Sequence, residues 1–119
     1  MATKAIDNPE SMLPLKPGDF HILMVLLERD LHGYGIMQAV AEQSAGTVQL
    51  EVGSLYRLIA RMTEGGLVAE VEESRDAGDR RRYYRITPFG REVAQGEARR
   101  LEEVVRTARA HDLLRDRHA

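Results

Sequence analysis

Six arginines within seventeen residues are the most concentrated chemical feature of this sequence. Residues 75–91 carry them against only two aspartates, a local balance of +4, although the whole chain of 119 residues has a net charge of −2. Arginine keeps a permanent positive charge and can hydrogen-bond a phosphate through two nitrogens at once. This patch therefore indicates contact with a polyanion such as nucleic acid, despite the acidic total.

The same arginines also fit a purely structural interpretation. A β-hairpin predicted around them would place glutamates of one strand opposite arginines of the other, and exposed ion pairs of this kind stabilise a hairpin only modestly. The residues concerned are Arg80, Arg81 and Arg82 with Glu70, Glu72 and Glu73. Both interpretations stay open from the sequence.

A second pair of arginines lies on the helix predicted over residues 53–64. Four of its apolar residues fall within one arc of about 100° and would seat it on a core: Leu55, Leu58, Ile59 and Met62. The opposite arc is centred on Arg57, Ala60 and Glu64. It is flanked by Tyr56 and Thr63 on one side and by Ser54 and Arg61 on the other. Arginine binds guanine through paired hydrogen bonds in the major groove, and Ser54 is placed to reach a phosphate. This face predicts a DNA-reading helix, with a solvated helix surface as the alternative.

The residue sets that most enzyme mechanisms require are missing. There is no cysteine, which excludes disulfides, thiol catalysis and thiolate-bound metals. No glycine-rich phosphate loop follows a predicted strand and no Ser/His/Asp grouping is evident, so we expect neither an enzyme nor a cofactor. His111 and His118 lie seven residues apart near Asp112 and leave a metal-responsive regulator as an alternative. Solvated histidines without a metal are the simpler expectation.

These residues need a scaffold of helices and one hairpin to position them. Apolar periodicity, proline starts and glycine stops predict helices over 17–29, 36–44, 53–64 and 88–110, a tight turn over 31–35 and a very short strand over 47–50. Alternating residues predict hairpin strands over 67–72 and 81–87. This order predicts a mainly α fold with a small β-hairpin, the winged helix-turn-helix. The expected parts are a flexible N-terminal arm (1–16), a winged-helix DNA-binding domain (17–87) and a C-terminal dimerisation helix with its tail (88–119).

Two helices carry more apolar surface than one small core can cover. The first has a stripe of four residues, Phe20, Leu23, Met24 and Leu27, and further apolar residues around it. In the last, apolar residues recur every seven positions at Ala94, Leu101 and Ala108. We therefore expect a homodimer, with a last helix that lies along its own domain as the simpler alternative. The expected dimerisation residues are Leu23, Leu27, Val93, Leu101, Val104, Val105 and Ala108.

Four spaced motifs resemble the PadR-like transcriptional regulators. They are Leu-His-Gly-Tyr-Gly-Ile (31–36), Gly-Ser-Leu-Tyr (53–56), Gly-Leu-Val (66–68) and Arg-Tyr-Tyr-Arg-Ile-Thr-Pro-Phe-Gly (82–90). The resemblance covers about residues 17–91 and implies a homodimeric bacterial repressor with a winged-helix fold. The short tail is similar to the family's smaller subgroup with a single C-terminal helix. One departure is Val52, which follows Glu51 where the family commonly has proline.

The patterns and the resemblance together predict double-stranded DNA with a palindromic operator as the partner. Two-fold symmetry would place the reading helices of a dimer ~34 Å apart, about one turn of DNA. The residues expected to contact DNA are Tyr34, Ser54, Tyr56, Arg57, Arg61, Arg75, Arg80, Arg81 and Arg82. A winged-helix module that binds a protein partner is the alternative.

A small hydrophobic or aromatic effector at the dimer interface is a further implication of the resemblance. The chain has no tryptophan and two phenylalanines, so an aromatic pocket would have few groups to use. The expected lining residues are Met12, Phe20, Met24 and Val93, with ordinary core packing as the simpler interpretation.

Length and hydropathy set the expected location. A chain of 119 residues holds one compact domain, and its longest apolar run, residues 22–27, is far shorter than a membrane span. The N-terminus lacks the apolar stretch and cleavage site of a secretory signal. We therefore expect a cytoplasmic protein without membrane contact.

Overall fold

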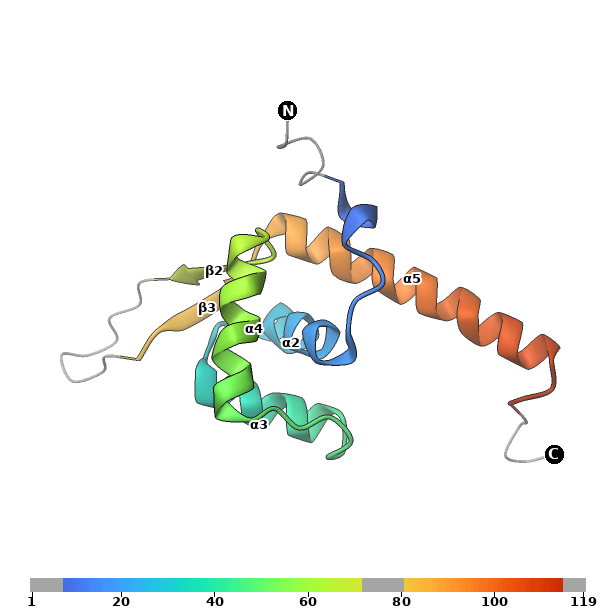
Figure 1. The fold of residues 1–119 in the computed structure, drawn as a ribbon, viewed down its shortest axis with the longest axis horizontal. Helices are drawn as coiled ribbons and strands as arrows, with labels where there is room; N and C mark the ends of the chain where they lie inside the picture. Colours follow the sequence, from blue (N-terminus) through green and yellow to red (C-terminus); the bar gives the residue numbers. More distant parts are fainter. Residues whose placement is uncertain (1–7, 72–80, 115–119) are drawn as a thin grey trace.

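The computed structural model describes residues 8–71 and 81–114. Its helices are η1 (Pro9–Met12), α2 (Pro17–Glu28), α3 (Gly33–Gln43), α4 (Val52–Glu64) and α5 (Pro88–Ala110), and its strands are β1 (Leu31–His32), β2 (Val68–Val71) and β3 (Tyr83–Ile86). The strands form an antiparallel sheet in the order β1-β3-β2. Figure 1 shows α2 near the centre, the β2–β3 hairpin projecting on one side and α5 extending on the other. The predicted mainly helical fold with a small sheet and a long last helix is confirmed.

Proline starts and glycine stops define the helix ends largely as predicted. α2 and α5 both begin with proline, whose missing N–H costs nothing in the first turn. α4 ends before two glycines, and Gly66 adopts a φ of 79°, a conformation that residues with a side chain resist. The helices predicted over 17–29, 53–64 and 88–110 agree with the structure to within one residue.

Two local predictions are wrong. The segment predicted as a tight turn over 31–35 forms strand β1 instead, and α3 begins directly after it at Gly33. His32 makes this possible because its Nδ1 accepts a hydrogen bond from the Gly35 N–H at 3.0 Å and caps the helix. The strand predicted over 47–50 does not form, since the Ser44 hydroxyl accepts a hydrogen bond from the Val48 N–H and holds a loop there.

Helix α2 supplies the centre of the core, but in a different rotation from the predicted one. Of the expected stripe only Leu23 is buried; Phe20 and Met24 are half-buried and Leu27 is exposed. The buried face consists of Ile22, Leu23, Val25 and Leu26, which meet α3, α5 and β3. Because α2 is apolar nearly all round, its periodicity does not determine which side faces inward.

Two expected dimerisation residues belong to this core. Leu23 on α2 and Val93 on α5 are completely buried within the protomer. A side chain enclosed by its own chain has no surface left to offer a second subunit. The prediction for these two residues is therefore corrected, and they are core residues.

Hydrogen bonds connect the start of α5 to the segment between α4 and β2. Thr87 caps α5 by accepting a hydrogen bond from the Gly90 N–H at 2.9 Å, and its hydroxyl donates to the Gly66 carbonyl. The Thr87 N–H in turn donates to the Leu67 carbonyl at 3.0 Å. Gly90 approaches so closely that an added Cβ would overlap the Leu67 carbonyl oxygen. Only glycine fits at this junction.

Residues 8–16, here called the strap, correct the prediction of a flexible arm. They contain η1 and lie along α5, as Figure 1 shows. The Leu15 N–H donates to the carboxylate of Glu97 at 3.2 Å. Glu97 is only 2% exposed and accepts two hydrogen bonds from Arg100, at 2.9 and 2.7 Å. Residues 1–7 lie outside the described part of the chain.

The Arg100 hydrogen bonds hold the pKa of Glu97 below its usual range, against the opposing effect of burial. Since this pKa is lowered on folding, the ionised carboxylate stabilises the fold above about pH 4.5, and the gain disappears as the pH falls through the folded pKa. We predict that Glu97→Gln costs about 1–2 kcal/mol at pH 7, from weakened charge-assisted hydrogen bonds. Urea unfolding followed by circular dichroism checks this. A difference from wild type that stays constant down to about pH 3 would contradict the assignment.

The close approach at Gly90 predicts that adding a single methyl group there lowers the stability more than Glu97→Gln does. Gly90→Ala should cost more than about 2 kcal/mol, because the new methyl group meets backbone rather than a movable side chain. Gly53→Ala is the matched control, since nothing lies within 4 Å of an added Cβ there. This control should be neutral or stabilise α4 by up to about 1 kcal/mol. Equal thermal midpoints for both variants would refute the close approach.

Candidate nucleic-acid interface

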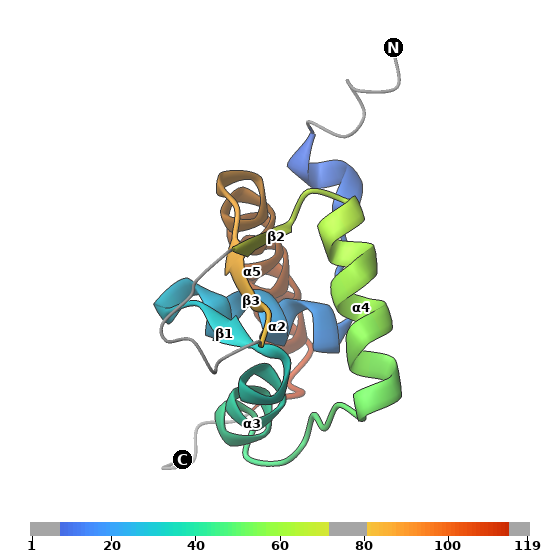
Figure 2. The same cartoon turned by 90° about the vertical axis from the view of Figure 1, so that its left-hand side faces the viewer.

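Helix α4 presents the outward face that the sequence predicts. Leu55, Ile59 and Met62 are buried and seat the helix on the core, with Leu58 half-buried beside them. Tyr56, Arg57 and Ala60 are exposed on the other side. Figure 2 shows α4 at one edge of the molecule, where none of the other described elements covers its outer side. The helix can therefore enter a groove without rearrangement of the fold.

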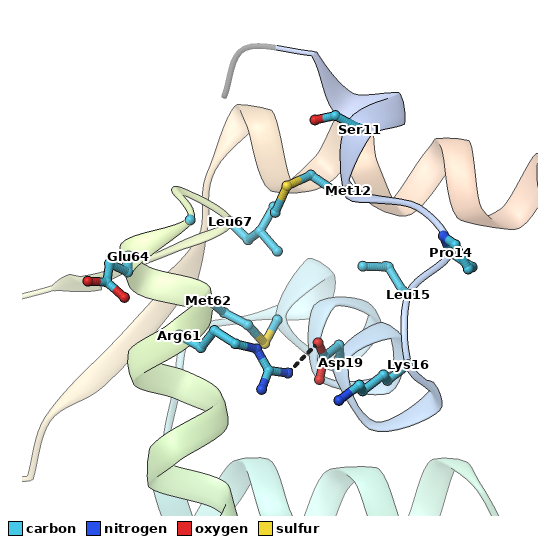
Figure 3. Close-up of a pocket in the computed structure, with 11 residues that line it drawn as sticks. Ser11, Met12, Pro14, Leu15, Lys16, Asp19, Arg61, Met62, Glu64 and Leu67 are labelled. Atoms are coloured by element: carbon cyan, nitrogen blue, oxygen red, sulfur yellow. Dashed lines mark hydrogen bonds and ion pairs between the residues drawn. The ribbon is translucent and has the colours of Figure 1, made fainter. Parts of the chain in front are cut away.

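The two arginines of α4 have different surroundings. Arg57 has no ion-pair partner within the described part of the chain. Arg61 donates from Nη2 to Oδ2 of Asp19 on α2 at 2.8 Å, as the close-up in Figure 3 shows. In this structure Arg61 thus joins two helices of its own chain. Its side chain stays 51% exposed, and contact with DNA stays a prediction for this residue.

A recess between α3, α4 and the hairpin brings several predicted residues together. Its volume is about 380 Å³, and we call it the wing recess. Four of the expected DNA-contacting residues line it: Tyr34, Tyr56, Arg81 and Arg82. His32, Gly33 and Tyr84 complete the lining. Ser54 lies half-buried in the first turns of α4, on the same helix as Tyr56.

His32 is a residue of this recess that sequence reasoning did not select. Its Nδ1 accepts from the Gly35 N–H, so the proton of the neutral ring is on Nε2. That Nε2 lies 3.2 Å from Nη1 of Arg81, which is also a donor. The two side chains therefore meet at this recess, and N–H groups are the kind of donor that binds phosphate oxygens. A histidine directly before a Gly-Tyr-Gly helix start was the available signal.

Gly33 allows α4 to approach the beginning of α3. A Cβ at this position would lie 2.5 Å from the Tyr56 hydroxyl. The absence of a side chain therefore lets Tyr56 lie against the first residue of α3. This contact places the Tyr56 hydroxyl at the same recess as His32 and Arg81.

Two arginines of the hairpin form ion pairs with carboxylates of the same chain. Arg82 lies 3.6 Å from Glu70 across the β2–β3 pair, which is one rung of the alternative ion-pair ladder. Arg85 makes hydrogen bonds of 2.8 and 3.2 Å with Asp30. Tyr84 packs into the core, and burial followed by the charge of Glu70 raises its pKa. Arg75 and Arg80, together with Glu72 and Glu73, lie outside the described residues.

The expected effector residues do not form one cavity. Met12 lines a separate recess beneath the strap, whereas Phe20 and Met24 lie half-buried along α2. Val93 is enclosed in the core and is removed from this set. The four residues therefore do not share a pocket within one protomer.

Neither metal ligands nor membrane helices are found in the part of the chain that the structure describes. Within residues 8–71 and 81–114, no group of three or more histidine, aspartate or glutamate side chains could hold a metal ion. His118 lies outside these ranges. None of the described helices is both long and apolar enough to cross a membrane.

Comparisons with known proteins agree with this arrangement. A family model described as "Transcriptional regulator PadR-like family" matches residues 22–96. An uncharacterised protein from Lysinibacillus sphaericus is 30% identical over 73 residues, which are 61% of this chain and 67% of that protein. The structure of a transcriptional regulator from Clostridium thermocellum is similar, with a TM-score of 0.68 and 26% identity. The match covers 78% of this chain and 87% of the Clostridium thermocellum chain.

Two further solved structures share the fold at lower identity. A PadR-family regulator from Clostridium difficile has a TM-score of 0.69 at 21% identity, over 81% of this chain and 98% of its own. Bacillus subtilis PadR in complex with operator DNA has a TM-score of 0.61 at 18% identity, over 70% of this chain and 47% of its own. These similarities confirm the predicted winged-helix architecture.

Proposed function

The chain belongs to the PadR-like family of transcriptional regulators, and we propose that it represses transcription in the cytoplasm by binding operator DNA as a homodimer. As a member of this family it is a regulator rather than an enzyme, in agreement with the sequence prediction. The observation that carries the proposal is one continuous surface. It combines the outward face of α4 with the donors of the wing recess.

In the proposed complex α4 lies in the major groove. Arg57 is its most suitable base reader, because it is exposed and Ala60 beside it permits close approach. The wing recess then meets the DNA backbone, where His32, Arg81 and Tyr56 offer N–H and O–H donors to phosphate. Bacillus subtilis PadR, which has a similar fold, is described in complex with operator DNA, and this supports DNA as the partner.

Exposed apolar residues on α2 and α5 support the homodimer. Leu27 is 38% exposed, Val104 50% and Val105 42%, while Leu101 and Ala108 are partly covered. Figure 1 shows the C-terminal half of α5 extending beyond the other elements. Burial of this stripe against a second copy would remove apolar surface from water. The arrangement would present two copies of α4 to a palindromic operator.

The proposed effector, a small hydrophobic or aromatic molecule, would lie at this dimer interface. Phe20 and Met24 support the location because they precede Leu27 by seven and three residues and share its side of α2. Two copies of this face would enclose a pocket that one protomer lacks.

Two substitutions in the proposed DNA interface distinguish recognition of bases from sequence-independent attraction to phosphates. Arg57→Ala should relax preference at one base pair, worth ~1–3 kcal/mol, and leave binding to random DNA almost unchanged. Arg81→Ala should weaken binding to every sequence and reduce the salt dependence by ~0.9 in log–log slope. Fluorescence anisotropy with selected and random duplexes measures both effects. Arg106→Ala is the control, since it removes the same charge from the exposed surface of α5.

Two results would contradict this assignment of roles. Equal effects of Arg57→Ala and Arg81→Ala on both duplexes would show that α4 does not read bases. Intact binding of a protein partner with no DNA binding at all would favour the protein-interaction alternative.

The dimer is tested by mass in solution. Light scattering on wild-type protein at micromolar concentration should give twice the chain mass of 13.4 kDa. Val105→Glu should give the mass of a single chain, because it places a charge in the apolar stripe. Ala110→Glu, on the opposite side of α5, should remain dimeric. Wild-type protein with the mass of one chain would refute the proposal.

A further inference from the structure

A recess beneath the strap has the features of a ligand site. It lies between the strap, the first turn of α2 and the last turn of α4, and its volume is about 610 Å³. Figure 3 shows Met12 and Leu15 of the strap facing Met62 and Leu67 across it. Its charged lining residues are Lys16, Asp19, Arg61 and Glu64. The recess is thus apolar on two sides and carries a few polar groups at its edge.

Asp19 has an unmet hydrogen-bonding requirement at this recess. The residue is only 7% exposed, and its Oδ2 accepts the hydrogen bond from Arg61. Its Oδ1 is buried and has no hydrogen-bond partner, which holds for no other buried side-chain oxygen or nitrogen in the described ranges. Buried polar atoms are almost always paired, so an exception points to a group that is missing.

The charges around Asp19 define the kind of group that would fit. Arg61 already balances the carboxylate at 2.8 Å. The other two charged lining residues, Lys16 and Glu64, carry one charge of each sign. What Oδ1 lacks is therefore a hydrogen bond rather than a counter-charge. A cationic ligand would add an unbalanced charge, and an anion would be repelled by Asp19. An uncharged N–H or O–H donor meets the requirement.

We propose that the strap recess binds a small uncharged molecule that has an apolar body and one hydrogen-bond donor. The donor binds Asp19 Oδ1, and the body lies against Met12, Leu15, Met62 and Leu67. Because Oδ1 is closed to solvent, a lining side chain must rotate to admit the ligand. Met12 and Met62 are flexible enough to do so.

This site is distinct from the proposed effector pocket between two copies. It is built within one protomer and shares only Met12 with the expected effector residues. Asp19 connects it to α4 through Arg61, which lies one helical turn after Arg57. The ligand site stands without the proposed function, since its binding is measured on protein free of DNA.

Two probes of nearly equal shape test the site. N-benzylacetamide carries an amide N–H, whereas benzyl acetate replaces that N–H with an oxygen. The amide should bind about ten-fold more tightly, as expected for one net hydrogen bond in a buried site. Methionine-methyl NMR titration should show shifts at Met12 and Met62 and none at Met37. Equal affinities, shifts outside the recess or no binding at millimolar concentration would overturn the proposal.

Three variants locate the donor contact. Asp19→Asn should abolish the preference for the amide over the ester. Asp30→Asn is the matched control, because Asp30 pairs with Arg85 in a similar way outside the recess, and it should keep the preference. Leu15→Trp should fill the recess and block both probes while leaving Asp19 in place. Full binding to Leu15→Trp would refute the site even if Asp19→Asn fails to fold.

Discussion

The arrangement of every functional element depends on the contact between Gly90 and the Leu67 carbonyl. Thr87 caps α5 with the same hydroxyl that binds the carbonyl of Gly66, directly after α4. Three elements therefore leave one small junction: helix α4, the hairpin and the long C-terminal helix α5. Because a single methyl group would not fit there, their relative directions are set by backbone contact rather than by adjustable side-chain packing.

A chain with a net charge of −2 can still carry local positive charge, because its arginines are unevenly distributed along the sequence. Arg61, Arg85 and Arg100 each form an ion pair with a carboxylate of the same chain at 2.7–2.8 Å, so these three arginines stabilise the fold. Arg57 has no such partner in the described ranges, and Arg81 faces His32. The charge available to a polyanion is therefore local, which makes sequence-independent attraction modest and leaves discrimination to a few side chains.

The bounds of three helices and the β2–β3 hairpin could be predicted because each depends on neighbours in sequence. The rotation of α2 could not, since nearly all of its sides are apolar and long-range packing chooses among them. The role of Arg61 depends on Asp19, a residue 42 positions earlier that no local pattern connects to it. The capping role of His32 could not be predicted from the sequence either, because two nearby glycines favour a turn as strongly as a helix start.

The polar side of helix α4 carries two arginines in different states. Arg57 has no ion-pair partner in the described ranges, whereas Arg61, one turn later, is held to α2 through Asp19. An apolar core alone would leave a reading helix free to slide by small amounts, because dispersion contacts have little directional preference. A charge-assisted hydrogen bond has a defined direction and fixes the last turn of α4. The second oxygen of Asp19 belongs to this same link between α2 and α4.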